Sequence, residues 1–244
     1  FVPENPDEVF DYTRDGWTVT PYEFLSRSNL DAAFDFHLNG STRMHSTSGW
    51  KFSEVVHDLG IRASDIAHQD FVVRAGTVED VRRAHEMGRL ALIPAMESSM
   101  MIENELNRID ILHGLGVRLM GIAYSNSNAL GTGLADMRPN DGGLTTFGRD
   151  AVERMNKIGM LISVSHSSDQ TALDVSRESE DPVLLTHDGA RALNGRDRLK
   201  PDECLEAVAD TGGVIGIQSA PHATVTYEHP EHTIVSVMEH FEYM

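Results

Sequence analysis

Five short apolar segments recur between residues 90 and 218, and stretches with helical spacing of apolar residues separate them. The five segments are 90–96, 117–123, 160–165, 182–186 and 214–218. None alternates apolar with polar residues, which is typical of strands buried on both faces of a parallel sheet. The pattern therefore restricts the chain to an α/β fold, either a (β/α)8 barrel or a doubly wound sheet.

The intervening stretches carry helix start and stop signals. Thr77 is a candidate N-cap, Pro201 stands at a helix start, and Gly159 and Gly212 follow helix ends. The predicted helices cover 78–87, 102–112, 146–158, 168–178 and 201–211. The last ten residues, 235–244, form an amphipathic pattern without a stop signal, so we expect the chain to be a fragment of a longer protein.

Residues 1–76 show no such regularity. Prolines and Gly/Ser/Asn-rich stretches interrupt this region, and candidate helices lie near 21–28 and 52–59. We therefore predict an N-terminal helical and loop segment of uncertain placement over 1–76, and a partial (β/α) barrel over 77–244.

Composition excludes several classes of protein. The formal net charge is −18, so a nucleic acid or an anionic membrane surface is a poor partner. The apolar runs are too short to span a membrane, and no signal peptide is visible, so we expect a cytoplasmic protein. The single cysteine, Cys204, excludes an internal disulfide framework and a Cys-based zinc site. The 12 histidines instead point to metal or acid–base chemistry.

Ligand-type side chains follow three of the five apolar segments. Glu97, His166 and His187 come directly after 90–96, 160–165 and 182–186. The carboxyl ends of barrel strands form one active-site rim, so we expect these three side chains to meet. A carboxylate and two imidazoles suit zinc or a similar divalent ion.

Several stretches, among them Val164-Ser-His-Ser-Ser168 and Pro182-Val-Leu-Leu-Thr-His187, resemble the renal or membrane dipeptidase family of the amidohydrolase superfamily. The resemblance covers about 77–244 and is specific, because many separate motifs occur in the right order. Its other stretches are 141–149, 155–156, 159–162, 190–193, 198–202 and 212–216.

The resemblance implies a TIM-like (β/α)8 barrel, incomplete in this chain, with two divalent metal ions, usually zinc. It implies that Glu97 bridges the two ions, that His166 and His187 bind the second, and that Arg198 holds the substrate's terminal carboxylate. It also implies a metal-dependent hydrolase that cleaves the amide bond of a dipeptide or N-acyl amino acid. The partner would be this small-molecule substrate, and a homodimer is compatible with the resemblance. Tyr124 stands where the mammalian enzymes carry a histidine that helps polarise the substrate carbonyl; a tyrosine hydroxyl can donate a hydrogen bond there, so we expect Tyr124 to be a catalytic residue.

The chain departs from the family at both ends. The opening His-x-Asp pair and the last strand with its catalytic Asp are absent, and we give His68-Gln-Asp70 and Asp35-Phe-His37 no metal role. Two alternatives stay open. Tyr124 favours a superfamily enzyme on another substrate, such as a lactone, thioester or other amide. The missing strands favour an inactive fragment with a partial metal site.

Overall fold

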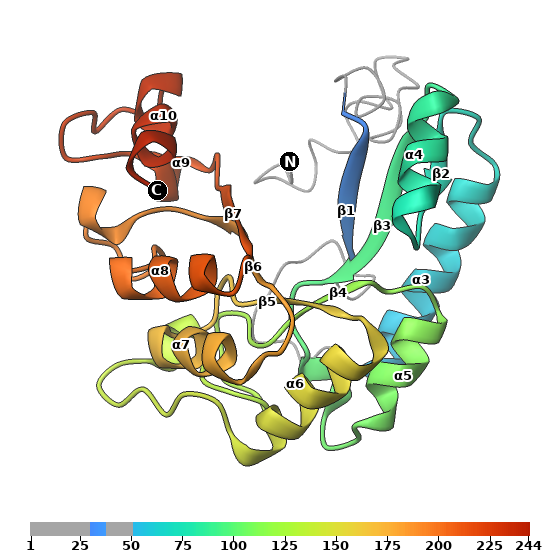
Figure 1. The fold of residues 1–244 in the computed structure, drawn as a ribbon, viewed down its shortest axis with the longest axis horizontal. Helices are drawn as coiled ribbons and strands as arrows, with labels where there is room; N and C mark the ends of the chain where they lie inside the picture. Colours follow the sequence, from blue (N-terminus) through green and yellow to red (C-terminus); the bar gives the residue numbers. More distant parts are fainter. Residues whose placement is uncertain (1–29, 38–50) are drawn as a thin grey trace.

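The computed structural model describes residues 30–37 and 51–244 and contains one parallel sheet there (Figure 1). The strands run in the order β1-β3-β4-β5-β6-β7, and β2 pairs with β3 outside this path. All the pairings are parallel. The strands are β1 (Ala32–His37), β2 (Val72–Arg74), β3 (Leu90–Met96), β4 (Leu119–Gly121), β5 (Leu161–Ser163), β6 (Val183–Asp188) and β7 (Val214–Ile217).

Helices connect most of these strands, and their ends follow the capping signals in the sequence. Thr77 caps its helix with a capping box, and Thr145 accepts a hydrogen bond from the Gly148 N–H. Gly159 follows the helix that Thr145 caps and ends it in the left-handed conformation. The helices are α3 (Phe52–Ala67), α4 (Val78–Glu86), α5 (Asn107–Gly114), α6 (Thr146–Ile158), α7 (Asp169–Glu178), α8 (Asp202–Asp210), α9 (Pro221–Thr224) and α10 (Ile234–Tyr243).

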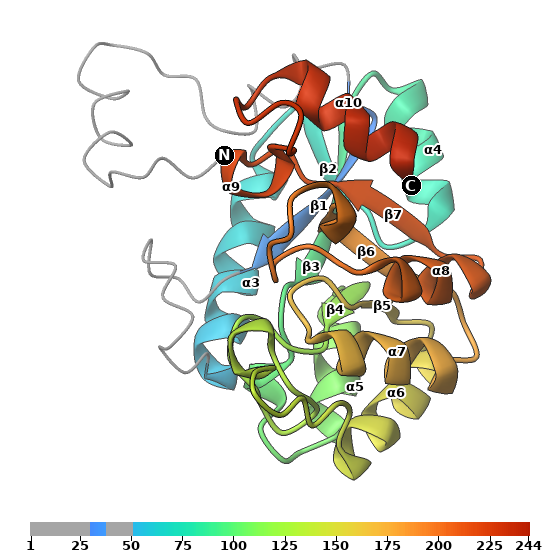
Figure 2. The same cartoon turned by 90° about the vertical axis from the view of Figure 1, so that its left-hand side faces the viewer.

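The sheet curls into part of a barrel. Helices α5 to α8 lie along its outer side, and β1 and β7 are the two ends of the strand order, at opposite sides of the curled sheet (Figures 1 and 2). The main core lies between the strands and these helices, and it includes Met120, Ile162 and Val183. The architecture is therefore the α/β half-barrel expected of an incomplete TIM-like fold.

Strand β3 begins and ends at the predicted residues, whereas β4 is shorter than predicted. The helix predicted over 102–112 begins only at Asn107. Residues 100–102 form a 3₁₀ helix, and Glu103 then takes a left-handed φ of 53°, which interrupts an α-helix.

Two strands lie where we predicted only helices and loops. β1 and β2 both come from the segment 1–76, and both pair with β3 in the same sheet. β2 has only three residues, too few to show a periodic pattern, and its strand conformation depends on the pairing. Helix α3 extends well beyond the predicted 52–59, the candidate helix near 21–28 lies outside the described residues, and the boundary at residue 76 stays a prediction.

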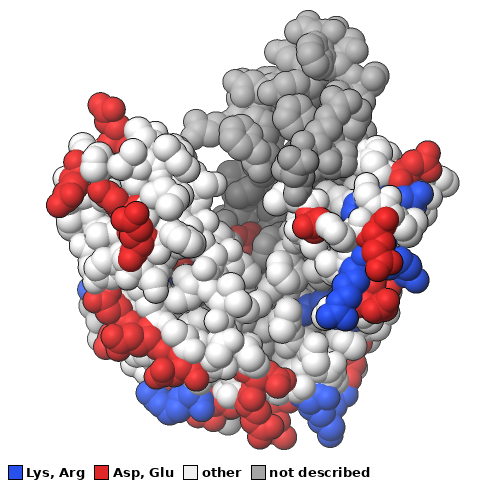
Figure 3. All heavy atoms as spheres, turned by 45° about the horizontal axis from the view of Figure 1, so that its top comes forward, with Lys and Arg blue, Asp and Glu red and all other residues white. Residues whose placement is uncertain are grey.

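The face seen in Figure 3 is hollowed at its centre, and Asp and Glu side chains cover several separate parts of it. Fewer Lys and Arg side chains lie on this face, in keeping with the formal net charge of −18. Among the helices described, none is both long and apolar enough to cross a membrane.

Candidate metal centre

Strands β3, β5 and β6 of the same sheet position the side chains that the sequence singled out. Glu97 directly follows β3, and His187 is the last residue but one of β6. His166 comes three residues after the end of β5, in the turn that follows it. All three therefore lie at the carboxyl ends of parallel strands, on one rim of the sheet.

The ligand-type atoms of these residues form a small triangle. Glu97 Oε1 lies 3.3 Å from His166 Nε2 and 3.1 Å from His187 Nε2. The two Nε2 atoms are 2.9 Å apart. The three side chains are largely buried, with 14%, 10% and 24% of their surface exposed for Glu97, His166 and His187. The predicted convergence on one rim is thus present in the structure.

The backbone of His166 has an uncommon conformation. Its φ is 63°, in the left-handed region that residues other than glycine rarely adopt. The Ser167 N–H donates to the Val164 carbonyl at 3.2 Å and closes the turn. From the loop after β4, the Leu134 N–H donates to the His166 carbonyl at 2.9 Å. Such strained residues concentrate at functional sites, because the surroundings must hold them in place.

Burial and mutual contacts set the protonation of the site. Burial raises the pKa of Glu97, but its interactions with His166 and His187 outweigh this effect and bring the pKa to about 2. Burial lowers the pKa of His166 to about 4, against the opposing effect of Glu97. At neutral pH the site therefore holds one carboxylate beside a neutral His166 imidazole, a protonation state that can bind a cation.

His187 also has the outer partner that metal-binding histidines usually show. Its Nδ1 lies 2.9 Å from Thr186 Oγ1. With Thr186 Oγ1 as acceptor for an Nδ1 proton, the Nε2 lone pair of His187 is available to a cation on the side of Glu97 and His166.

The spacing of the donor atoms fits a tetrahedral cation. Ligands bonded to zinc at about 2.0–2.1 Å in tetrahedral geometry lie roughly 3.3–3.4 Å from one another. The separations here are 3.3, 3.1 and 2.9 Å, so displacements of a few tenths of an ångström suffice. Two imidazoles with one carboxylate are also a common donor set for zinc. The residues present thus fit a divalent metal.

Tyr124 joins the site from the loop after β4. Its ring stacks on the His166 imidazole, with centroids 4.1 Å apart and an interplanar angle of 23°. Burial, and to a lesser extent the negative charge of Glu97, raises the pKa of Tyr124 to about 12. The phenol is therefore protonated at neutral pH and able to donate a hydrogen bond.

Arg198 reaches the site from the loop before α8. Its Nη2 donates to the His187 carbonyl at 2.8 Å and lies 3.5 Å from His166 Nε2. Its Nη1 donates to Asp188 Oδ2 at 3.1 Å, and Asp188 is fully buried. Asp188 was not among the predicted site residues, because only its contact with Arg198 distinguishes it from an ordinary polar strand end.

The two motifs to which we assigned no metal role, His68-Gln-Asp70 and Asp35-Phe-His37, lie in different places. His68 and Asp70 lie between α3 and β2, at the amino end of that strand and away from the rim. Asp35 and His37 lie on β1, where the register places His37 opposite Met96. The His37 side chain lies outside the described part of the chain.

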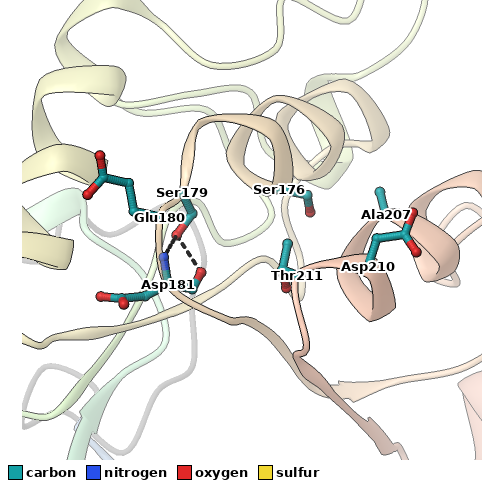
Figure 4. Close-up of a pocket in the computed structure, with 7 residues that line it drawn as sticks. All are labelled: Ser176, Ser179, Glu180, Asp181, Ala207, Asp210 and Thr211. Atoms are coloured by element: carbon teal, nitrogen blue, oxygen red, sulfur yellow. Dashed lines mark hydrogen bonds between the residues drawn. The ribbon is translucent and has the colours of Figure 1, made fainter.

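Two other polar features are separate from this centre. Glu228, His229 and Glu239 form an exposed cluster, but both Glu239 oxygens already have partners in Thr226 and His229, so the cluster ties the loop after α9 to α10. A groove of about 350 Å³ lies at the C-terminal ends of α7 and α8 (Figure 4). It is lined by Ser176, Ser179, Glu180, Asp181, Ala207, Asp210 and Thr211, close to the amino ends of β6 and β7.

Comparisons with known proteins identify relatives in sequence and in fold. Dipeptidase aclJ of Aspergillus oryzae is 29% identical over 199 residues, which are 78% of this chain and 47% of the relative. An amidohydrolase from Pseudomonas aeruginosa has a similar structure, with a TM-score of 0.80 and 26% identity over 91% of this chain and 64% of that one. A metallo peptidase from Rhodobacter sphaeroides, solved with a phosphinate mimic of the dipeptide L-Ala-D-Ala, has the same fold, with a TM-score of 0.71 and 21% identity over 87% of this chain and 67% of that one.

The chain spans about half the length of the curated relatives it matches. The sequence pattern of the membrane dipeptidase family matches residues 61–244, which include Glu97, Tyr124, His166, His187 and Arg198. Because that match covers well over half of the chain, the protein belongs to the membrane dipeptidase family, peptidase family M19.

Proposed function

We propose that this chain carries the metal site of a hydrolase that cleaves the amide bond of a dipeptide or an N-acyl amino acid. The convergence of Glu97 Oε1 with the Nε2 atoms of His166 and His187 carries the proposal. A divalent cation, with zinc as the first candidate, polarises the scissile carbonyl and makes the attacking water more acidic.

The three residues account for one ion. Glu97 brings a negative charge, and the imidazoles of His166 and His187 offer their Nε2 atoms as the other two donors. The second ion that the resemblance implies needs additional ligands, and among the side chains that the structure describes no other group of three ligand-type residues includes Glu97. We therefore propose that Glu97, His166 and His187 bind one ion.

Tyr124 would act on the substrate carbonyl. Its hydroxyl stays protonated at neutral pH, because its pKa is about 12. Stacking on His166 holds the ring beside the ligand atoms, where the hydroxyl can donate to an oxygen that gains negative charge in the reaction.

Arg198 would bind the terminal carboxylate of the substrate. A guanidinium can donate two parallel hydrogen bonds to a carboxylate, and the position of Nη2 near His166 puts this group next to the reacting bond. Because Nη1 already contacts the buried Asp188, the substrate would compete with that carboxylate or share the guanidinium with it.

A paired-substrate assay tests this function. L,L- and L,D-dipeptides, each as the free acid and as the C-terminal amide, are incubated with the protein in the presence and absence of Zn²⁺. We expect Zn²⁺-dependent cleavage that favours the free acids. Arg198→Ala should reduce kcat/KM more for the acid than for the amide, because only the acid offers the guanidinium a charged partner.

Arg177→Ala is the matched control, because Arg177 is exposed on α7 and pairs with Asp174 on the same helix. An equal loss on acid and amide in Arg198→Ala would contradict the anchor role. Tyr124 in place of a histidine favours testing lactone and thioester substrates alongside. Cleavage of those alone would contradict dipeptide hydrolysis and support the alternative substrate class.

A further inference from the structure

Lys200 is a fully buried lysine close to the metal centre. Only 1% of its surface is exposed, although lysine is among the residues least often buried. Its Nζ donates a hydrogen bond to the Ser167 carbonyl. Burial lowers the pKa of Lys200, and the nearby carboxylate of Asp188 opposes this effect.

The backbone of Lys200 is held as firmly as its side chain. Its N–H donates to the Gly189 carbonyl at 3.0 Å, and its carbonyl accepts from the Arg191 N–H at 2.8 Å. These bonds fasten Lys200 to the segment that follows β6, two residues beyond His187. The side chain therefore extends from the β6 side of the site to the turn after β5, where Nζ meets the Ser167 carbonyl.

The carbonyl that Lys200 contacts belongs to the turn that positions His166. Ser167 follows His166 directly, and its side chain is fully buried. His166 itself has a left-handed φ of 63°. A non-glycine residue keeps this conformation only where its neighbours hold it. The Leu134 N–H holds the His166 carbonyl from one side, and Lys200 holds the next carbonyl from the other.

We propose that Lys200 is a positioning residue that fixes the His166 turn and thereby directs His166 Nε2 toward Glu97 and His187. This inference rests on the proposed metal site. It assigns the buried Nζ donor a role through the backbone, without contact with the cation or the substrate. Removing the donor leaves the Ser167 carbonyl without this partner in a buried place, so the turn should relax and the imidazole should shift.

Two variants separate hydrogen bonding from packing. Lys200→Met keeps most of the side-chain volume but removes the donor, whereas Lys200→Gln keeps an N–H donor without the charge. Lys157→Met on α6 is the matched control, because Lys157 is exposed. The first measurement is the ¹⁵N spectrum of the histidine rings in the metal-free chain, with the His166 signals assigned through His166→Gln. The second is the affinity for Co²⁺ alone, titrated by its visible absorption.

We expect Lys200→Met to shift the His166 ring signals and to weaken Co²⁺ binding by about 10- to 100-fold, the range typical of lost outer-shell partners. The His166 ring signals and the Co²⁺ affinity of Lys200→Gln should be closer to those of the unsubstituted chain than those of Lys200→Met are. Lys157→Met should give the same values as the unsubstituted chain. Unchanged ring signals and Co²⁺ affinity in Lys200→Met would overturn the proposal, as would a Lys200→Gln variant that lies no closer than Lys200→Met.

If Lys200→Met does not fold, Lys200→Gln alone tests the proposal. His166 ring signals near those of the unsubstituted chain support the positioning role of Lys200, and displaced signals overturn it. The proposed function fails in a distinguishable way. An unsubstituted chain that binds no Co²⁺ contradicts the metal site, while the ring signals of the metal-free variants still decide whether Lys200 positions His166.

Discussion

His166 and His187 meet through their Nε2 atoms at 2.9 Å, although 21 residues separate them in the chain. Two imidazoles so close cannot both carry a proton on these facing nitrogens without repulsion, and burial already lowers the pKa of His166 to about 4. With Glu97 Oε1 within 3.3 Å of both, at least one lone pair is directed into the space between the three groups. This arrangement suits a cation better than a purely structural hydrogen-bond network.

Tyr124→Phe separates the hydroxyl of Tyr124 from its ring. The phenylalanine keeps the stacking on His166, so the content of bound Zn²⁺ should not change. The loss of a donor to the reacting carbonyl should lower kcat by about 100- to 1,000-fold, the effect typical of one such donor. Zn²⁺ content by atomic absorption and dipeptide kinetics provide the test. An unchanged kcat with unchanged Zn²⁺ would exclude this role for the hydroxyl.

Cys204 should resist alkylation in the folded chain. Its thiol is fully buried, and burial raises its pKa from 9.0 to about 12, so almost no thiolate forms at pH 8. Iodoacetamide at pH 8 should leave the folded protein unmodified and modify the urea-unfolded protein once, as mass spectrometry would record. Modification at equal rates in both states would contradict the buried position.

The raised pKa of Cys204 also makes the stability of the folded chain depend on pH in the alkaline range. The pKa of Cys204 is higher in the folded than in the unfolded state, so its contribution to stability is fully present below about pH 9 and is lost as the pH rises toward 12. Cys204→Ala should therefore reduce the slope of Tm against pH in this range. Parallel slopes for the two proteins would contradict the shift.

Gly121, at the end of β4, allows the backbone of Glu97 to approach closely because glycine has no Cβ. A Cβ at Gly121 would lie 2.2 Å from the Glu97 carbonyl oxygen, so Gly121→Ala must displace the end of β3. We expect a loss of about 1–3 kcal/mol in the free energy of unfolding, measured in urea, together with weaker Zn²⁺ binding.

Gly60→Ala is the matched control for this substitution. Gly60 lies within α3, and a Cβ there would meet nothing within 4 Å. This variant should be more stable by about 0.4–1 kcal/mol, because alanine restricts the unfolded chain and favours the helix. A Gly121→Ala variant as stable as Gly60→Ala would show that the close approach to Glu97 is not rigid.

The sequence predicted those elements of the fold that leave a local signal, either a continuous apolar run or a capping residue. The predicted strand 90–96 has the same bounds as β3. Thr77 caps the start of α4 and Gly159 ends α6, as their residue types predicted. The positions of Glu97, His166 and His187 after apolar runs predicted that they would share one rim. That inference needed only the rule that parallel strands end on the same side.

The features that the sequence did not predict depend on tertiary contacts, which leave no local pattern in the sequence. β2 has three residues and exists through its pairing with β3. Asp188 reads as an ordinary polar strand end until Arg198 is brought next to it. Lysine is usually exposed, so nothing in the sequence distinguished the buried Lys200 from a surface residue. The left-handed turn at His166 likewise lacks the glycine that would have predicted it.

The central claim, that Glu97, His166 and His187 bind a divalent cation, is tested most directly by equilibrium dialysis of the metal-free chain against Zn²⁺. The comparison is with Glu97→Gln, which keeps the side-chain shape but removes the charge, and with Glu79→Gln, whose carboxylate is exposed on α4. We predict one tightly bound Zn²⁺ in the unsubstituted chain and in Glu79→Gln, and binding weaker by at least about 10-fold in Glu97→Gln, because one of three ligands loses its charge. Equal Zn²⁺ binding in Glu97→Gln and the unsubstituted chain, or none in either, would contradict the metal site.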